Sequence, residues 1–414
     1  MKFPLLVYPS RIQVPSTRVS MTIRVGGEVK EIEVGGSRRI RREIFEDLIR
    51  TLRAIFSGEV KVIKVNSLHL FEIGFQDVPQ LTVPREKYFL ETLNELNYIP
   101  IALVIDIFDE GEEVCQRNCR ICYARNVLKR LRNTKPQISI EGDEKDLPNL
   151  IQDVITNVVK NVNTVALLND IDVEYFDITL AFGGLNEPLH YSTLIEDIAR
   201  NVPHTIVVGN HPIHIYKALT TSDMLSASAL FDTFPRVFDV IAFSIPTEAL
   251  SKYFSHTIRD FYALPSAIRR GLGVAQLVVL QFIVHGDYMD TVRTMHVVKT
   301  TLQDVLPVSE YDRVIFYPIM YYPTIPEVKQ ISCGDFEHFF NLFIDLVSED
   351  DSIDLAKFMI DTCATKLLLN YDVCSLVRKY KMYYRVIVTR KPNFKVRVDV
   401  YEVDGCPLGE KCVY

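Results

Sequence analysis

The chain has 414 residues, of which 48% are hydrophobic and 24% are charged, so it can bury a sizeable core and is predicted to be a globular protein of two or three domains. Its 46 basic and 53 acidic side chains give a net charge of −7, which excludes a global positive field for nucleic acid but leaves a local basic patch open. Since no apolar run is long enough to span a bilayer and the first residues do not resemble a secretory signal, we predict a cytoplasmic protein with no membrane partner.

Residues 1–95 are predicted to form an N-terminal α+β accessory domain. The runs RVSMTIRV and VKEIEVGG flank a Gly-Gly-Glu turn, a pattern that predicts a β-hairpin. Between residues 40 and 56 apolar side chains recur every three or four positions, which predicts a helix with one buried stripe.

Residues 96–350 are predicted to alternate strands with helices. Six mostly continuous apolar runs predict buried parallel strands near residues 99–108, 173–182, 204–209, 238–246, 275–284 and 313–322. Helices are expected between and after them, near residues 145–165, 190–201, 212–230, 247–270, 287–306 and 335–348. About six β/α units indicate an α/β fold with a partial (β/α)6 TIM-like barrel, and a doubly wound sheet is the alternative. In either architecture the reactive groups belong at the carboxyl ends of the strands.

Three of the eight cysteines directly follow the first predicted strand, in the segment CQRNCRIC: Cys115, Cys119 and Cys122. In a reducing compartment such residues are expected to be thiols or metal ligands rather than disulfides. A structural zinc site normally closes with four ligands, whereas this loop offers three, and the next cysteine, Cys333, lies far along the chain. Three thiolates would leave one iron of a cubane cluster open to a small molecule, so the spacing predicts a reactive site.

The spacing C-x3-C-x2-C after a first barrel strand resembles the signature of the radical S-adenosylmethionine superfamily. The resemblance implies a 4Fe-4S cluster on Cys115, Cys119 and Cys122, with S-adenosylmethionine bound at the open iron. It further implies reductive cleavage of this cofactor to a 5′-deoxyadenosyl radical, which takes a hydrogen atom from the substrate. An external electron donor such as ferredoxin or flavodoxin would supply the electron.

The segment FGGLNEPLH after the second predicted strand resembles the Gly-Gly-Glu-Pro segment of that superfamily, which receives the amino group of the cofactor. The resemblance assigns cofactor binding to Gly183, Gly184 and Glu187. Two residues separate the glycines from the glutamate, so either Glu187 or backbone carbonyls near the glycines would meet the ammonium group. An ordinary strand-to-helix turn is the alternative interpretation of the glycine pair.

Three further residues are assigned to the cofactor by the same resemblance. Ser244, at the end of the fourth predicted strand, would lie near the ribose or carboxylate, and its alternative role is to cap the next helix. Ile121 and Ile319 would pack on the adenine, and their alternative is ordinary barrel core.

His211 and His214 are predicted near the barrel mouth, where imidazoles could move protons or serve only as loop residues.

Residues 351–414 are predicted to form a small C-terminal Cys-rich β-hairpin extension that turns at KPNF. Its cysteines could hold a second 4Fe-4S cluster or a zinc ion, and a disulfide between the last two is a further alternative. Such a tail resembles the auxiliary-cluster (SPASM/twitch-like) extension of superfamily members that modify peptides or sugars. The cysteines in question are Cys363, Cys374, Cys406 and Cys412.

The resemblance therefore favours a maturase-type enzyme with a peptide, protein or small-molecule substrate. Modification of RNA fits the same core, so nucleic acid is a possible but not a favoured partner. The third interpretation is a non-catalytic binding scaffold with a metal-stabilised loop. The sequence assigns no catalytic residue beyond the cluster ligands.

Overall fold

The computed structural model describes four strands between residues 19 and 75, as backbone, and residues 98–403 with short gaps and one longer gap at 347–380. The four C-terminal cysteines, the helix predicted over residues 40–56 and much of the helix predicted over residues 335–348 lie outside the described residues. None of the helices that the structure describes is long and apolar enough to cross a membrane.

The N-terminal strands form a four-stranded sheet with the order β2-β1-β4-β3. β1 (Val19–Val25) and β2 (Glu28–Val34) pair in antiparallel fashion along their whole length, which confirms the predicted hairpin. β4 (Phe71–Phe75) lies parallel to β1 and antiparallel to β3 (Val60–Lys64).

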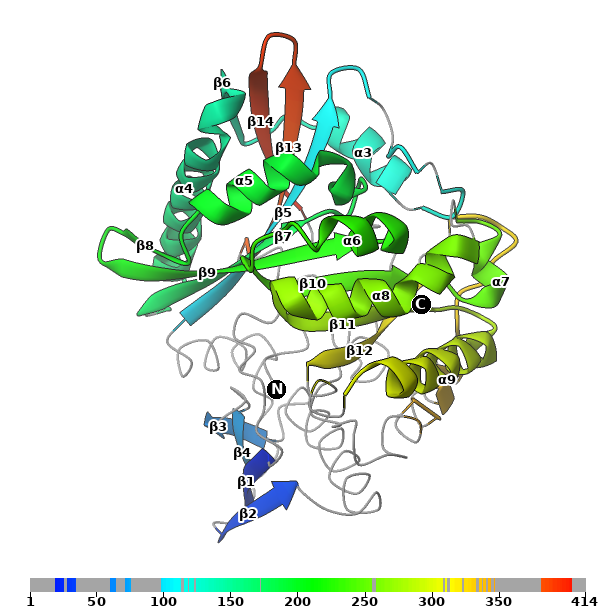
Figure 1. The fold of residues 1–414 in the computed structure, drawn as a ribbon. Helices are drawn as coiled ribbons and strands as arrows, with labels where there is room; N and C mark the ends of the chain where they lie inside the picture. Colours follow the sequence, from blue (N-terminus) through cyan, green and yellow to red (C-terminus); the bar gives the residue numbers. More distant parts are fainter. Residues whose placement is uncertain are drawn as a thin grey trace.

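The main sheet has ten strands, six of which run parallel and lie side by side in chain order (Figure 1). A doubly wound sheet reverses its strand order part-way, which these six strands do not do, and the α/β class is confirmed. Since all six strands point the same way, the loops that follow them meet at one edge of the sheet. The six strands are β5 (Tyr98–Asp109), β7 (Tyr175–Phe182), β9 (His211–Thr221), β10 (Phe238–Ile245), β11 (Ala275–Val284) and β12 (Val314–Met320).

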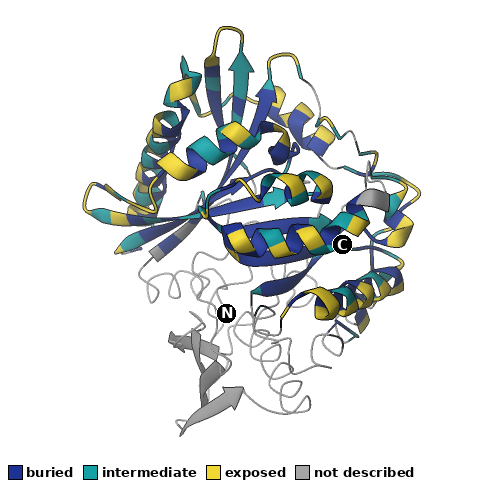
Figure 2. Cartoon of the chain, in the orientation of Figure 1, coloured by how far each residue is buried: buried dark blue, intermediate teal, exposed yellow. Residues whose placement is uncertain are grey.

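One face of the main sheet packs with the helices around the largest apolar core, and Figure 2 shows these strands as mostly buried. The opposite face carries a smaller apolar cluster that includes Ala181, Ala218 and Ala242. The helices predicted near residues 145–165, 190–201 and 287–306 are confirmed. The described helices are α3 (Ala124–Arg132), α4 (Leu147–Leu168), α5 (Ser192–Asn201), α6 (Met224–Leu230), α7 (Glu248–Ser251), α8 (Ile258–Val274) and α9 (Tyr288–Val305), with 3-10 turns η1 (Glu144–Asp146) and η2 (Pro188–Tyr191).

The third parallel strand differs from the prediction. Residues 204–209 contain β8 (Thr205–Val208), which pairs antiparallel with β9. β9 occupies the first half of the segment predicted as a helix over residues 212–230, and α6 confirms the second half. The polar residues of HPIHIYKALTT interrupt the apolar pattern of this strand, so the sequence did not predict it. Lys217 in this strand is buried, and its Nζ donates to the carbonyl of Ala199 at 2.6 Å. His211 and His214 therefore begin β9, next to the rings of Phe176 and Tyr175, and their predicted position at the mouth is wrong.

The C-terminal hairpin is confirmed, but it belongs to the main sheet. β13 (Tyr383–Lys391) and β14 (Lys395–Glu402) pair antiparallel around the predicted turn. β13 also pairs in parallel with β5, and β14 pairs with β6 (Ile138–Asp143), so the hairpin extends the sheet beyond its first parallel strand. A strand from the end of the chain thus lies directly beside the strand that leads into the cysteine loop (Figure 1).

Candidate active site

The three cysteines of the motif lie between the carboxyl end of β5 and the start of α3. All three are half-buried, and the backbone N–H of Cys122 donates to the carbonyl of Cys119 at 3.2 Å. The pKa of Cys115 is raised, mainly by burial and also by the charges of Glu187 and Cys119. The pKa of Cys122 is raised to about 11, mainly by burial and also by the charges of Cys119 and Cys115. The thiols are therefore close enough to repel one another as thiolates, and a bound cation would offset that repulsion.

The donor chemistry of this loop suits a thiophilic metal centre, because three cysteine sulfurs are the ligands that iron–sulfur clusters prefer. No other cysteine lies among the described residues. Within the described part of the chain, no three cysteine, histidine, aspartate or glutamate side chains are already gathered as a metal site. The loop thus offers the predicted donors, and their convergence would accompany cluster binding.

A largely buried arginine inside the loop ties it to the helices that cover the sheet. Arg117, between the first two cysteines, forms an ion pair with Asp223 at 2.8 Å and lies 3.5 Å from Asp260. Asp223 is also the N-cap of α6, since its side chain accepts from the backbone N–H of Ser226 at 2.9 Å. Because both acids have largely buried side chains, water screens these ion pairs little, and they hold the first half of the loop in place.

The second half of the loop contacts the segments after β10 and β12. The backbone N–H of Arg120 donates to the carbonyl of Tyr253 at 2.9 Å, and the Thr324 hydroxyl donates to the carbonyl of Ile121 at 2.7 Å. The Ile121 side chain is buried in a cluster with Leu250, Tyr321 and Val328. Ile319 is half-buried against a different cluster, so the two residues predicted to pack on the adenine do not share one apolar cluster.

Both glycines of the FGGLNEPLH segment have a backbone that only glycine adopts readily. Gly183 has a φ of +92°, and a Cβ atom there would lie 2.6 Å from the carbonyl oxygen of Thr220. Gly184 has a φ of +142°, and its Cβ atom would lie 2.6 Å from Nη1 of Arg385. The chain therefore passes close to β9 on one side and to β13 on the other, which a side chain at either position would prevent.

The carboxylate of Glu187 is buried and points toward the end of β9. It accepts hydrogen bonds from the Thr221 hydroxyl at 2.6 Å, from the Ser222 N–H and hydroxyl at 3.1 Å each, and from the Leu189 N–H at 3.3 Å. Burial raises the pKa of Glu187, while the hydrogen bonds from Thr221 and Ser222 lower it. Glu187 also acts on the Cys115 thiol: the charge of its carboxylate raises the pKa of Cys115, while its backbone N–H lowers it. The glycine segment and the cysteine loop are therefore neighbours.

Ser244 lies near the carboxyl end of β10, where its hydroxyl donates to Oε1 of Gln281 on β11 at 2.9 Å. The alternative role as a helix cap is not what the structure shows. Thr247 is the N-cap of the next helix, α7, because its side chain accepts from the N–H of Leu250. Ser244 and Gln281 instead form a polar pair on adjacent strands at the edge that carries the cysteine loop.

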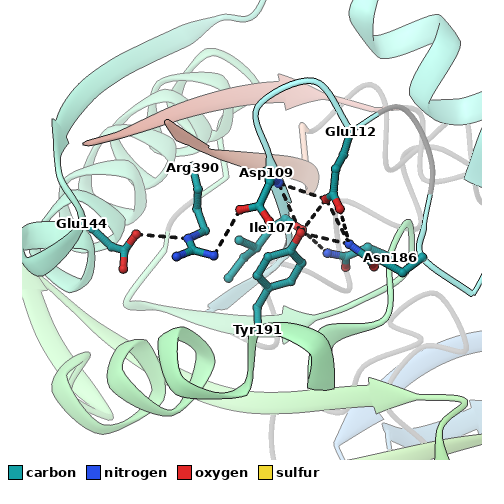
Figure 3. A network of polar contacts seen from close by, with 8 residues as sticks. Ile107, Asp109, Glu112, Glu144, Asn186, Tyr191 and Arg390 are labelled. Atoms are coloured by element: carbon teal, nitrogen blue, oxygen red, sulfur yellow. Dashed lines mark hydrogen bonds and ion pairs between the residues drawn. The ribbon is translucent and has the colours of Figure 1, made fainter. Parts of the chain in front are cut away.

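A polar network that sequence reasoning missed joins the start of the cysteine loop to the end of the glycine segment (Figure 3). The Tyr191 hydroxyl donates to Oε2 of Glu112 at 2.5 Å and accepts from Nε2 of Gln116 at 3.0 Å and from the N–H of Asp109 at 3.2 Å. Arg390 on β13 reaches the same place through an ion pair with Asp109 at 3.1 Å. Tyr191 is close in sequence to the FGGLNEPLH motif, which was the one available signal for it.

Replacing Tyr191 with phenylalanine should lower the free energy of unfolding by about 1–2 kcal/mol, because Glu112, Gln116 and the N–H of Asp109 would each lose one hydrogen-bond partner in a half-buried place. Urea unfolding of the purified protein measures the change. Tyr262→Phe is the matched control, because that tyrosine is 78% exposed and its variant should unfold like the unmodified chain. Equal losses in the two variants would contradict the role of the network.

No family model and no curated protein matches the sequence, and the similarities found are to solved structures. The chain is similar to SuiB of Streptococcus suis bound to the precursor peptide SuiA, with 12% identity, a TM-score of 0.40, and coverage of 91% of this chain and 81% of that one. It is also similar to anSMEcpe with bound AdoMet and Cp18Cys peptide, with 16% identity, a TM-score of 0.33, and coverage of 66% of this chain and 67% of that one. A third similarity is to TYW1 with a lysine-pyruvate adduct bound, with 9% identity, a TM-score of 0.35, and coverage of 75% of this chain and 83% of that one.

These are distant likenesses. SuiB and anSMEcpe have both been solved with S-adenosylmethionine bound. What the chain itself can do follows from its own residues: three thiols, a glycine pair and a buried glutamate at one edge of a parallel sheet.

Proposed function

We propose that this chain is a radical S-adenosylmethionine enzyme in which Cys115, Cys119 and Cys122 hold a catalytic 4Fe-4S cluster. One observation carries the proposal: the three-thiol loop and the glycine segment follow the neighbouring parallel strands β5 and β7, so they meet at one edge of the sheet, where Cys115 interacts with Glu187. The bound cluster would supply one electron for reductive cleavage of S-adenosylmethionine, which gives a 5′-deoxyadenosyl radical that abstracts hydrogen from a substrate. The sequential parallel strands fit the partial (β/α)6 barrel on which we place this chemistry.

The residues of the chain would bind and orient the cofactor. Gly183 and Gly184 let the segment pass close to β9 and β13, which fixes the backbone that would receive the cofactor. Since the Glu187 carboxylate already accepts from Thr221 and Ser222, we assign the cofactor ammonium to backbone carbonyls of the segment together with this buried negative charge. The Ser244 and Gln281 pair would meet polar atoms of the ribose or carboxylate, and Ile121 and Ile319 would flank the adenine.

The substrate that we propose is a peptide, protein or small molecule, and the electron donor is an external ferredoxin or flavodoxin in the cytoplasm. Four cysteines in the last part of the chain, the number that saturates a 4Fe-4S cluster, support a maturase-type role with a second cluster. The four are Cys363, Cys374, Cys406 and Cys412.

The experiment that tests the function is anaerobic reconstitution of the full chain with iron and sulfide, followed by addition of S-adenosylmethionine and dithionite. We expect release of 5′-deoxyadenosine and methionine in equal amounts, and none without dithionite. Protein that binds iron and sulfide yet releases no 5′-deoxyadenosine would contradict the proposal and support the scaffold interpretation. Salt-sensitive RNA binding by an active enzyme would instead support RNA as the substrate.

A further inference from the structure

A fully buried ion pair joins the first strand of the parallel set to the last part of the chain. Asp106 on β5 and Arg385 on β13 lie 2.9 Å apart, with 0% and 5% of their side chains exposed. The pair is possible because β13 lies parallel to β5, with Arg385 opposite Val104. Such a pair adds little net stability by itself, because desolvation of the two charges offsets their attraction.

The two residues of this pair hold the glycine segment between them. Oδ1 of Asp106 accepts from the backbone N–H of Leu185 at 2.7 Å, while its other oxygen accepts from Arg385. Nη1 of Arg385 fills the space where a side chain at position 184 would begin, because a Cβ atom there would lie 2.6 Å away. The N–H of Gly183 donates to the carbonyl of Ile105 at 3.0 Å. Each of the three successive residues therefore meets β5 or β13.

A neighbouring ring limits the movement of the guanidinium. The Arg385 guanidinium lies 5.9 Å from the centre of the Tyr383 ring, a distance at which a cation and an aromatic face attract. Tyr383 lies two residues earlier on the same strand, so its ring is on the same face of the sheet as Arg385. The arginine is thus held by an anion and a ring while it lies against the backbone of Gly184.

We propose that Arg385 is a positioning residue for cofactor binding: with Asp106 it fixes residues 183–185 in the conformation that receives the amino end of S-adenosylmethionine. The inference rests on the proposed function, and it adds to the site a residue from the C-terminal hairpin. Arg385 acts through Gly184 and Leu185 and need not touch the cofactor.

The test compares Arg385→Lys with Lys391→Met in the reconstituted full chain. Arg385→Lys keeps the positive charge but loses the planar guanidinium, whose Nη1 both donates to Asp106 and lies against Gly184. Lys391→Met removes a charge from the same strand, where Lys391 pairs with the largely exposed Glu141 at 2.6 Å. Anaerobic equilibrium dialysis gives the Kd of S-adenosylmethionine, and electron paramagnetic resonance of the reduced cluster reports whether the bound cofactor alters the spectrum.

We expect Arg385→Lys to raise the Kd of S-adenosylmethionine by about tenfold or more. Substitution of a residue that orients the binding residues commonly weakens binding by this factor. The iron content should stay unchanged, and saturating cofactor should restore the normal spectrum. Lys391→Met should bind the cofactor as the unmodified chain does. A Kd for Arg385→Lys within twofold of that of the unmodified chain would overturn the inference and leave the proposed function intact. An unmodified chain that binds no S-adenosylmethionine would overturn both.

Gly184→Ala provides a second test in case Arg385→Lys does not fold. The added methyl group would clash with Nη1 of Arg385, which lies 2.6 Å from the position of the new Cβ atom, while the charges of Asp106 and Arg385 are both kept. The same rise in Kd is expected, and the change should be smaller than additive when Gly184→Ala and Arg385→Lys are combined, because both act on one contact. A Kd unchanged by Gly184→Ala would overturn the inference.

Discussion

Replacing Cys115, Cys119 and Cys122 together with alanine is expected to remove about four iron atoms and as many sulfides per chain and to abolish release of 5′-deoxyadenosine. The loop offers no substitute ligand, because the three thiols are the only cysteines among the described residues. Iron and sulfide analysis after anaerobic reconstitution measures the first effect, and product chromatography measures the second. Unchanged iron and activity would contradict the assignment of these ligands.

Two control variants separate this loss from a general effect of removing thiols. Cys333→Ala removes a cysteine that is not part of the motif, and it should keep full iron content and activity. Cys406→Ala combined with Cys412→Ala should lose only the iron of the proposed second cluster. If that double variant keeps as much iron as the unmodified chain, the second cluster is wrong, and the catalytic cluster is unaffected.

The sequence predicted the parts of the site that depend on local patterns. The cysteine spacing and the glycine pair stand directly after β5 and β7, and neighbouring parallel strands bring such loops together without any further information. The positive φ of Gly183 and Gly184 gives a physical reason for the glycine pair. Most strands and helices were predictable for the same reason, since each is a continuous apolar run or a stripe with helical spacing.

Long-range pairing was not predictable from those patterns. β13 follows β5 by more than 270 residues, so no local signal placed Arg385 opposite Val104 or beside Asp106. β9 was mistaken for a helix because its histidines, proline and lysine interrupt the apolar run, and the burial of Lys217 depends on the carbonyl of Ala199, an acceptor on α5. Pairing that depends on tertiary contacts overrides local propensity in both cases.

Asp106→Asn should lower the free energy of unfolding by about 3–5 kcal/mol, because it removes the negative charge that lies 2.9 Å from the buried guanidinium of Arg385. The change is nearly isosteric, and the side-chain carbonyl could still accept from the N–H of Leu185, so the loss isolates the charge. Burial raises the pKa of Asp106, while the charge of Arg385 and the N–H of Leu185 lower it, so the ion pair offsets part of the desolvation of the carboxylate. Urea unfolding of the variant gives the free energy.

Asp109→Asn is the matched control for this change. Asp109 lies on the same strand and pairs with another arginine of β13, Arg390, at 3.1 Å, but 47% of its side chain is exposed. Water screens such a pair, so its loss should cost less than about 1 kcal/mol. The double variant Asp106→Leu with Arg385→Met should recover much of the stability, because it removes both buried charges and fills their space. Recovery of stability without recovery of cofactor binding would show that the pair serves the conformation of residues 183–185 rather than the stability of the sheet.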